Sequence, residues 1–127
     1  MSFKEKISKI KAIVLDMDGV MTDGLLGYGE KEEIKFFHVR DGHGIKMARR
    51  AGLKVGILSA RQAEANRRRA QELELDFFYE GRKDKKEAFQ QLLSENGGPV
   101  HRPFQYAFCT HLKLKRQCIA VRPWPMQ

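Results

Sequence analysis

The sequence KAIVLDMDG, residues 11–19, combines a short apolar run with two aspartates and a turn. A run that is apolar at every position and contains β-branched residues is typical of a strand buried in a parallel sheet. Asp16 and Asp18 stand two residues apart at its end, and alternate residues of an extended chain point to the same side. The stretch therefore predicts a central strand with two carboxylates at its carboxyl end.

Two further runs of strand type follow, at residues 54–58 (KVGIL) and 76–79 (DFFY). Segments with helical spacing of apolar residues lie between and after them, at residues 45–51, 62–73 and 84–96. Strands and helices that alternate in this order form right-handed βαβ units on a parallel sheet. We therefore expect an α/β fold with a three-layer Rossmann-like parallel sheet.

Residues 25–39 interrupt this alternation between the first strand and the first helix. Two alternating segments, around residues 25–27 and 34–39, flank a turn that contains Gly29, which predicts a β-hairpin insertion. The second arm (IKFFHV) is unusually apolar for a hairpin that faces solvent. An exposed strand of this kind tends to pair with another chain, so the hairpin is a candidate for self-association.

Three loops should meet at one edge of the sheet, because parallel sheets bind ligands beyond the carboxyl ends of their strands. These loops span residues 16–23, 59–61 and 81–85. Asp16 and Asp18 offer oxygen ligands alone, which suit a hard cation such as magnesium. Ser59 offers a hydroxyl, Arg61 a phosphate or carboxylate ligand, and Lys85 a point positive charge.

A pair of carboxylates in this position can process a phosphate ester. One can attack phosphorus while the other transfers protons to and from the leaving group. A cation is needed as well, since two unit negative charges about 4 Å apart repel by roughly 4 kcal/mol at an effective dielectric constant of about 20. A phosphate dianion adds to that repulsion, so the two aspartates predict a metal-assisted site.

Each of these residues also has an ordinary structural interpretation. Asp-x-Asp-Gly is common in turns. A serine after a strand is a frequent helix N-cap, and a lysine in the charged run 82–86 is commonly solvated. The functional interpretation depends on their combination, because each residue follows a predicted strand of the same sheet.

Residues 16–24 (DMDGVMTDG) resemble the first motif of the haloacid dehalogenase superfamily of phosphohydrolases. Together with residues 39–45 (VRDGHGI), 57–61 (ILSAR) and 79–85 (YEGRKDK), they resemble the capless 3-deoxy-D-manno-octulosonate 8-phosphate phosphatases. The resemblance covers about residues 8–95. It implies a core with no cap domain and a magnesium-dependent phosphomonoesterase that hydrolyses this acidic sugar phosphate in lipopolysaccharide biosynthesis.

The resemblance also implies a role for each site residue. Asp16 would be the nucleophile that forms an aspartyl-phosphate, and it would ligate Mg²⁺. Asp18 would be the general acid and base, with its backbone carbonyl on the metal. Ser59 would hold the phosphoryl oxygens, and Asp18, Ser59 and Arg61 form the expected substrate-binding set. Lys85 would stabilise the nucleophile and the phosphoryl charge.

The family resemblance extends to the assembly. The hairpin at residues 25–39 matches the element through which these phosphatases build a homotetramer, in which a neighbouring subunit closes each capless site. This implication agrees with the apolar second arm of the hairpin.

The last part of the chain departs from the family pattern. Residues 1–96 hold 19 of the 24 Lys and Arg residues and all 16 acidic residues, and residues 97–127 hold five basic residues and no acid. The family's fourth motif, an acidic loop that completes the magnesium site, is therefore missing, although residues 106–108 (YAF) resemble the strand before it. We divide the chain into a phosphatase core, 1–96, and an atypical basic tail, 97–127, which we attribute to a shifted reading frame or a degenerate end.

Several other interpretations remain open at this point. Losing metal ligands weakens metal binding, so the alternative is a catalytically impaired family member that serves as an oligomeric assembly subunit. Cys109, His111 and Cys118, with His101 nearby, could hold zinc, but their spacing matches no usual zinc site.

Composition limits the remaining classes of partner. The net charge of +8 would suit a nucleic-acid-binding protein, but no motif of that class accompanies it, so we expect no nucleic-acid partner. No apolar run approaches the roughly 18 residues of a membrane-spanning helix, and the start has no secretory signal. We expect a cytoplasmic protein with no membrane contact.

Overall fold

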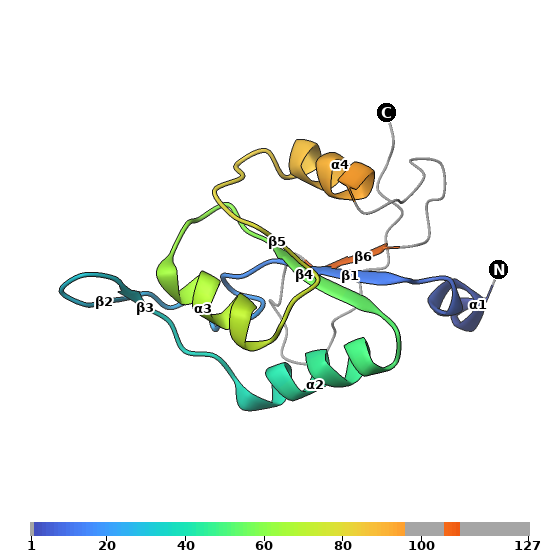
Figure 1. The fold of residues 1–127 in the computed structure, drawn as a ribbon, viewed down its shortest axis with the longest axis horizontal. Helices are drawn as coiled ribbons and strands as arrows, with labels where there is room; N and C mark the ends of the chain where they lie inside the picture. The colour runs from blue at the N-terminus through green and yellow to red at the C-terminus, as the bar shows by residue number, and fades with distance from the viewer. Residues whose placement is uncertain (1, 96–105, 110–127) are drawn as a thin grey trace.

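The computed structural model describes residues 2–95 and 106–109, and their core is a four-stranded parallel sheet in the order β5-β4-β1-β6 (Figure 1). The strands are β1 (Ala12–Leu15), β4 (Lys54–Leu58), β5 (Phe77–Tyr79) and β6 (Tyr106–Cys109). β1 pairs with β4 on one side and with β6 on the other. This central position explains why every residue of the strand is apolar, as the sequence predicts.

Helices cover both faces of the sheet, which gives the predicted three layers (Figure 1). They are α2 (Val39–Arg50) and α3 (Glu64–Glu72) on one face and α4 (Lys85–Glu95) on the other, while α1 (Phe3–Ser8) precedes β1. Val14 and Leu58 pack with Leu92 of α4 in one apolar cluster. Ile57 packs with Ile45 of α2 in the second, on the opposite face. Alternation along the strands thus divides the core between the two helical layers.

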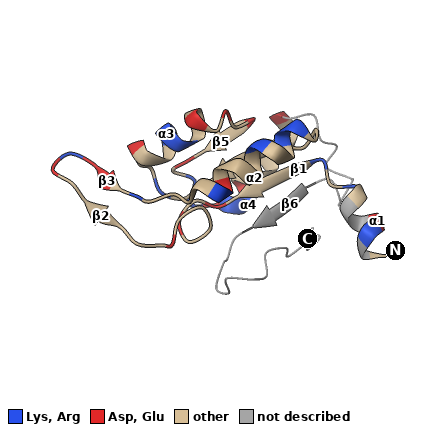
Figure 2. Ribbon diagram, turned by 90° about the horizontal axis from the view of Figure 1, so that it is seen from below, with Lys and Arg blue, Asp and Glu red and all other residues tan. Residues whose placement is uncertain are grey.

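The predicted hairpin is present but much shorter than expected. Its strands are β2 (Gly27–Tyr28) and β3 (Glu33–Ile34), which pair antiparallel and project away from the main sheet (Figure 2). Residues 35–38, predicted as part of the second arm, form no strand. No cap domain is present in the part of the chain that the structure describes, where the hairpin is the insertion between β1 and β4.

Helix α2, predicted from Ile45, begins six residues earlier, at Val39. His38 caps it, since its Nδ1 accepts a hydrogen bond from the Arg40 N–H at 3.1 Å. The prediction failed here because glycine is a poor helix former. Gly42 packs closely against α3 and the residue after it: a Cβ in its place would lie 2.8 Å from the flexible end of the Arg69 side chain and 3.1 Å from Leu73 Cδ2.

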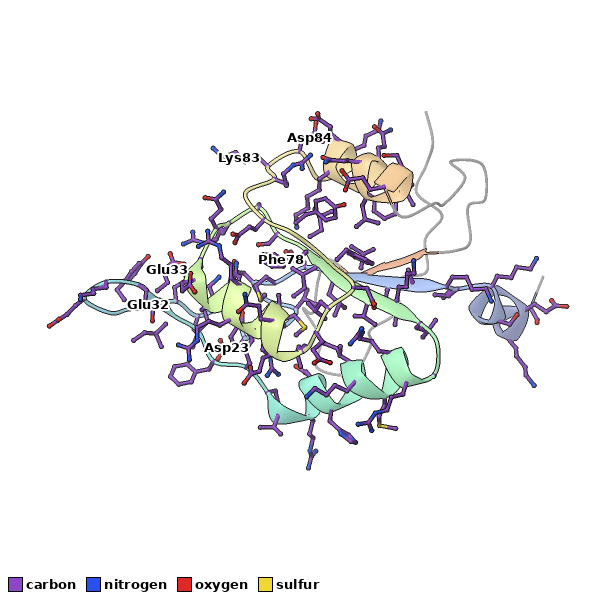
Figure 3. All side chains as sticks on the ribbon, in the orientation of Figure 1. Asp23, Glu32, Glu33, Phe78, Lys83 and Asp84 are labelled. Atoms are coloured by element: carbon purple, nitrogen blue, oxygen red, sulfur yellow. The ribbon has the colours of Figure 1, made fainter. Side chains whose placement is uncertain are left out.

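The predicted helices at residues 62–73 and 84–96 are observed as α3 and α4 with slightly shorter bounds. Lys83 and Asp84 lie in the loop that leads into α4 (Figure 3). The Asp84 carboxylate accepts a hydrogen bond from the Glu87 N–H at 3.1 Å, so it caps the helix that begins at Lys85.

β6 lies beyond the boundary at residue 96 and joins the core sheet, with Cys109 opposite Leu15. The boundary itself stays a prediction. The remaining residues of the predicted tail lie outside the described part of the chain, and so do the candidate zinc ligands His101, His111 and Cys118. Within the described part, each helix is too short or too polar to cross a membrane.

Candidate active site

Asp16 and Lys85 form an ion pair at the carboxyl end of β1. Asp16 Oδ2 lies 2.9 Å from Lys85 Nζ, and both side chains are largely buried. Asp16 Oδ1 accepts a hydrogen bond from the Met17 N–H at 2.8 Å. The nucleophile candidate and the cation candidate, which are far apart in the sequence, are thus brought into contact by the parallel sheet.

The loop after Asp18 is held in a fixed turn by its own backbone. The Met17 carbonyl accepts the Met21 N–H at 2.9 Å. Thr22 Oγ1 accepts the N–H groups of Gly19 and Gly24, each at 3.2 Å. Both glycines have positive φ, +80° and +86°, which other residues rarely adopt. These hydrogen bonds and backbone angles hold the loop, and with it the backbone of Asp18, in a defined turn.

Asp18 faces two cations from different parts of the chain. Its Oδ1 lies 2.8 Å from Lys35 Nζ, and its Oδ2 lies 3.9 Å from Arg61 Nε. Lys35 comes from the segment after β3, and its side chain is completely buried. Lys35 Nζ also donates to Asn66 Oδ1 at 2.9 Å. Asp18 is therefore held by the hairpin side of the site as well as by its own loop.

Arg61 and Ser59, the predicted substrate-binding residues after β4, lie in different surroundings. The Arg61 guanidinium is half-exposed and contacts Glu33 of β3 as well as facing Asp18. Ser59 is buried, and its hydroxyl donates to the Arg61 carbonyl at 3.1 Å. Arg61 thus points toward Asp18, and Ser59 supports the loop that carries Arg61. The phosphoryl-binding role of Ser59 stays a prediction.

The site also contains three residues that the sequence analysis missed: Lys35, Glu33 and Asn66. Glu33 lies beside the start of α3 (Figure 3) and pairs with Arg61. A signal existed for Lys35, since it is a single full charge within the apolar run of residues 34–39. Nothing in the local pattern marks Glu33, which ends the charged run of residues 30–33, or Asn66, which lies in the largely polar segment of residues 64–69.

Three carboxylates and three cations therefore meet at this edge of the sheet. The carboxylates belong to Asp16, Asp18 and Glu33, and the cations to Lys35, Arg61 and Lys85. Positive groups at this position can bind an anionic ester, while Asp16 and Asp18 can act as nucleophile and proton carrier. The arrangement fits phosphoryl transfer.

The donors needed for a divalent metal are partly present. Asp16 and Asp18 supply carboxylate oxygens, and Mg²⁺ typically binds one or two carboxylates and keeps several waters. Among the described residues, no group of three or more His, Cys, Asp or Glu side chains is placed to hold a metal ion. The two aspartates fit Mg²⁺ in ligand type and number, without a third carboxylate from the described part.

Comparison with known proteins decides the family. The chain is 42% identical over 95 residues to the 3-deoxy-D-manno-octulosonate 8-phosphate phosphatase of Haemophilus influenzae, an alignment that spans 74% of this chain and 53% of that protein. The enzyme of Escherichia coli K12 is 38% identical over 91 residues, which span 71% of this chain and 48% of the relative. Over its matched residues, the chain is homologous to these phosphatases. It spans about half the length of the curated relatives it matches.

Solved structures show the same fold. A probable phosphatase of the YrbI family from Pseudomonas syringae superposes with a TM-score of 0.75 and 37% identity, covering 82% of this chain and 58% of that one. The phosphatase of Moraxella catarrhalis, solved with magnesium, phosphate and the sugar acid, gives 0.73 and 29%, with 84% and 62% covered. No family model matches the chain. The predicted family and the predicted α/β fold of the phosphatases are thus confirmed.

Proposed function

We propose that the chain is a divalent-metal-dependent phosphomonoesterase that hydrolyses 3-deoxy-D-manno-octulosonate 8-phosphate through an aspartyl-phosphate on Asp16. The observation that carries this proposal is the contact between Asp16 and Lys85 at 2.9 Å, beside Asp18. Support for the substrate comes from the names of the relatives and from the sugar acid bound in the Moraxella structure.

In the first step, an oxygen of Asp16 attacks phosphorus and the bond between phosphorus and the sugar oxygen breaks. Lys85 offsets the charge that builds up on the carboxylate and the phosphoryl group. Arg61 binds an anionic part of the substrate. Asp18 gives its proton to the departing sugar oxygen, which leaves as an alcohol.

In the second step, water attacks the phosphorus of the aspartyl-phosphate. Asp18, now a carboxylate, takes a proton from that water, and inorganic phosphate leaves as the Asp16 carboxylate is restored. Magnesium, which the Moraxella relative binds, would be held here by the Asp16 carboxylate and the Asp18 backbone carbonyl and would offset the negative charge of the phosphate.

The oligomer and the cellular setting belong to the same proposal. The hairpin exposes large apolar side chains, among them Leu25 at 72%, Tyr28 at 79% and Phe36 at 77% of their full surface. A homotetramer assembled through residues 25–39 would cover them. We place the activity in the cytoplasm, in lipopolysaccharide biosynthesis. The alternative, an assembly subunit without catalysis, gains no support from relatives that are named as phosphatases.

The test is magnesium-dependent release of inorganic phosphate from the sugar phosphate by the full chain. Asp16→Asn keeps the shape of the side chain and removes the nucleophile, so we expect release to fall by about a thousandfold or more. Chelation of the metal should abolish release by the unmodified chain. Equal rates for the unmodified chain and Asp16→Asn would show that the proposed mechanism is wrong.

A further inference from the structure

We propose that Lys35 is a positioning residue that holds the Asp18 carboxylate in place for protonation of the leaving group. The inference rests on the proposed function, because it assigns a part in that reaction to a residue outside the strand-end loops. It makes the hairpin segment a component of the reaction centre as well as a surface for association.

The burial of Lys35 is the first observation. Its side chain has no exposed surface, while the flanking Ile34 and Phe36 are 46% and 77% exposed. This inverts the usual pattern, in which lysine stays in water and apolar side chains are buried. A buried ammonium is costly unless it is paired and hydrogen-bonded. The buried position of Lys35 is therefore explained by the charged and polar partners that its ammonium group contacts inside the protein.

Those partners lie in the active site. Lys35 Nζ donates to Asp18 Oδ1 at 2.8 Å and to Asn66 Oδ1 at 2.9 Å. Asn66 is itself completely buried in α3, and its Nδ2 donates to the Arg61 carbonyl at 3.3 Å. The Ser59 hydroxyl donates to the same carbonyl. Lys35 is thus fixed by a hydrogen-bonded chain that connects Asp18 to the loop after β4.

The contact determines which oxygen of Asp18 is available for proton transfer. Oδ1 is engaged by Lys35, and this contact restrains rotation of the carboxylate. Oδ2 has Arg61 Nε at 3.9 Å, beyond hydrogen-bond distance. Oδ2 is therefore the oxygen that carries the proton to the leaving group. Misplacing a catalytic group by about 1 Å can cost on the order of a hundredfold in rate.

The test compares two substrates that differ in their need for a proton. The sugar alkoxide must be protonated as it leaves, whereas p-nitrophenolate leaves without a proton. Lys35→Met removes the donor and keeps the length of the side chain. We expect kcat/KM for the sugar phosphate to fall by about a hundredfold, and kcat/KM for p-nitrophenyl phosphate by less than about threefold. Hydrolysis of the aspartyl-phosphate does not affect this comparison, because kcat/KM includes only the steps up to and including the first irreversible one.

Matched variants separate positioning from folding. Lys46→Met removes an exposed lysine of α2, outside residues 25–39, and should leave both substrates unaffected. Lys35→Arg keeps a charged donor and should recover part of the loss. On the sugar phosphate alone, Lys35→Met should lower kcat and leave KM nearly unchanged, whereas a lost substrate contact would raise KM.

Equal losses on both substrates, or no loss on either, would overturn the role of Lys35 while leaving the proposed function intact. Absence of metal-dependent phosphate release by the unmodified chain would instead overturn the proposed function, and the role of Lys35 with it. Thermal unfolding of each variant, followed by circular dichroism, checks that the losses come from folded protein.

Discussion

Two clusters of carboxylates and cations lie at opposite ends of the sheet, and they differ in how their oxygens are used. At the amino end, Asp76 Oδ1 accepts from Arg49 at 3.1 Å, and Oδ2 accepts from Arg49 at 3.1 Å and from the Val55 N–H at 2.8 Å. At the carboxyl end, Asp18 Oδ1 accepts from Lys35 at 2.8 Å, whereas Asp18 Oδ2 faces Arg61 Nε at 3.9 Å, beyond hydrogen-bond distance. The first cluster is saturated, and the second leaves an oxygen for chemistry.

The pKa of Asp76, the carboxylate of the saturated cluster, indicates a structural role. Burial raises the pKa of Asp76, but the hydrogen bonds from Arg49 and from the Val55 N–H outweigh burial, so the pKa lies below its ordinary value. The carboxylate form is therefore the one that the fold stabilises. The same pairing of Asp with a basic side chain thus supports stability at one end and reactivity at the other.

The largest effect on kcat is expected at the carboxyl end of the sheet, in a comparison of two variants that each remove one cation. Lys85→Met removes the group that contacts Asp16, and we expect kcat for phosphate release to fall by about a hundredfold to a thousandfold, as when one charge-stabilising donor is lost from an active site. Arg49→Met removes the cation of the saturated cluster. It should leave kcat within about threefold of the unmodified chain. Both are measured by phosphate release under metal-saturating conditions.

A comparable loss of kcat in Lys85→Met and Arg49→Met would break the comparison. It would mean that the two clusters act together through the stability of the sheet. Measuring both variants well below their unfolding temperatures keeps stability out of the rates.

A smaller effect is expected at Asp76 itself. Asp76→Asn removes the charge that accepts three hydrogen bonds, and we expect the free energy of unfolding to fall by about 1–3 kcal/mol at neutral pH. Urea denaturation followed by circular dichroism measures the change. Phosphate release per folded molecule should stay the same, and a lost activity without lost stability would contradict the structural role.

The pH dependence of this stability follows from the direction of the shift. Because the pKa of Asp76 is lower in the folded chain, its contribution is complete above the ordinary Asp value of about 3.9 and is lost as the pH falls through the folded value. The difference in unfolding free energy between the unmodified chain and Asp76→Asn should therefore shrink as the pH falls from 5 to 3. A difference that grows toward acid would reverse this sign.

The smallest effect should come from an exposed ion pair on α3. Arg67 and Glu64 lie 3.2 Å apart, with about half of each side chain in water. Pairs of this kind contribute little because solvent screens them. Glu64→Gln should change neither kcat nor the urea midpoint beyond experimental error. If Glu64→Gln lost as much stability as Asp76→Asn, the hydrogen bonds that both oxygens of Asp76 accept would not be the reason for its contribution to stability.

The sequence predicted the sheet better than the hairpin. Strands β1 and β4 lie between two helical layers, so β1 is apolar at every position and β4 has no polar residue after the exposed Lys54. This pattern has one explanation. Residues 34–39 also look like a strand. Lys35 turns inward to Asp18 and α2 begins at Val39, and both depend on contacts with parts of the chain that the local pattern does not include.

What the sequence determined by itself is the parallel sheet, its alternation with helices, and the placement of Asp16, Asp18 and Lys85 at one edge. These follow from local periodicity and from the rule that parallel strands end on the same side. The tertiary structure alone decided that Lys35 and Asn66 belong to the site. The physical reason is that a buried ammonium is stable where carboxylate and amide oxygens surround it, and such surroundings come from segments distant in the sequence.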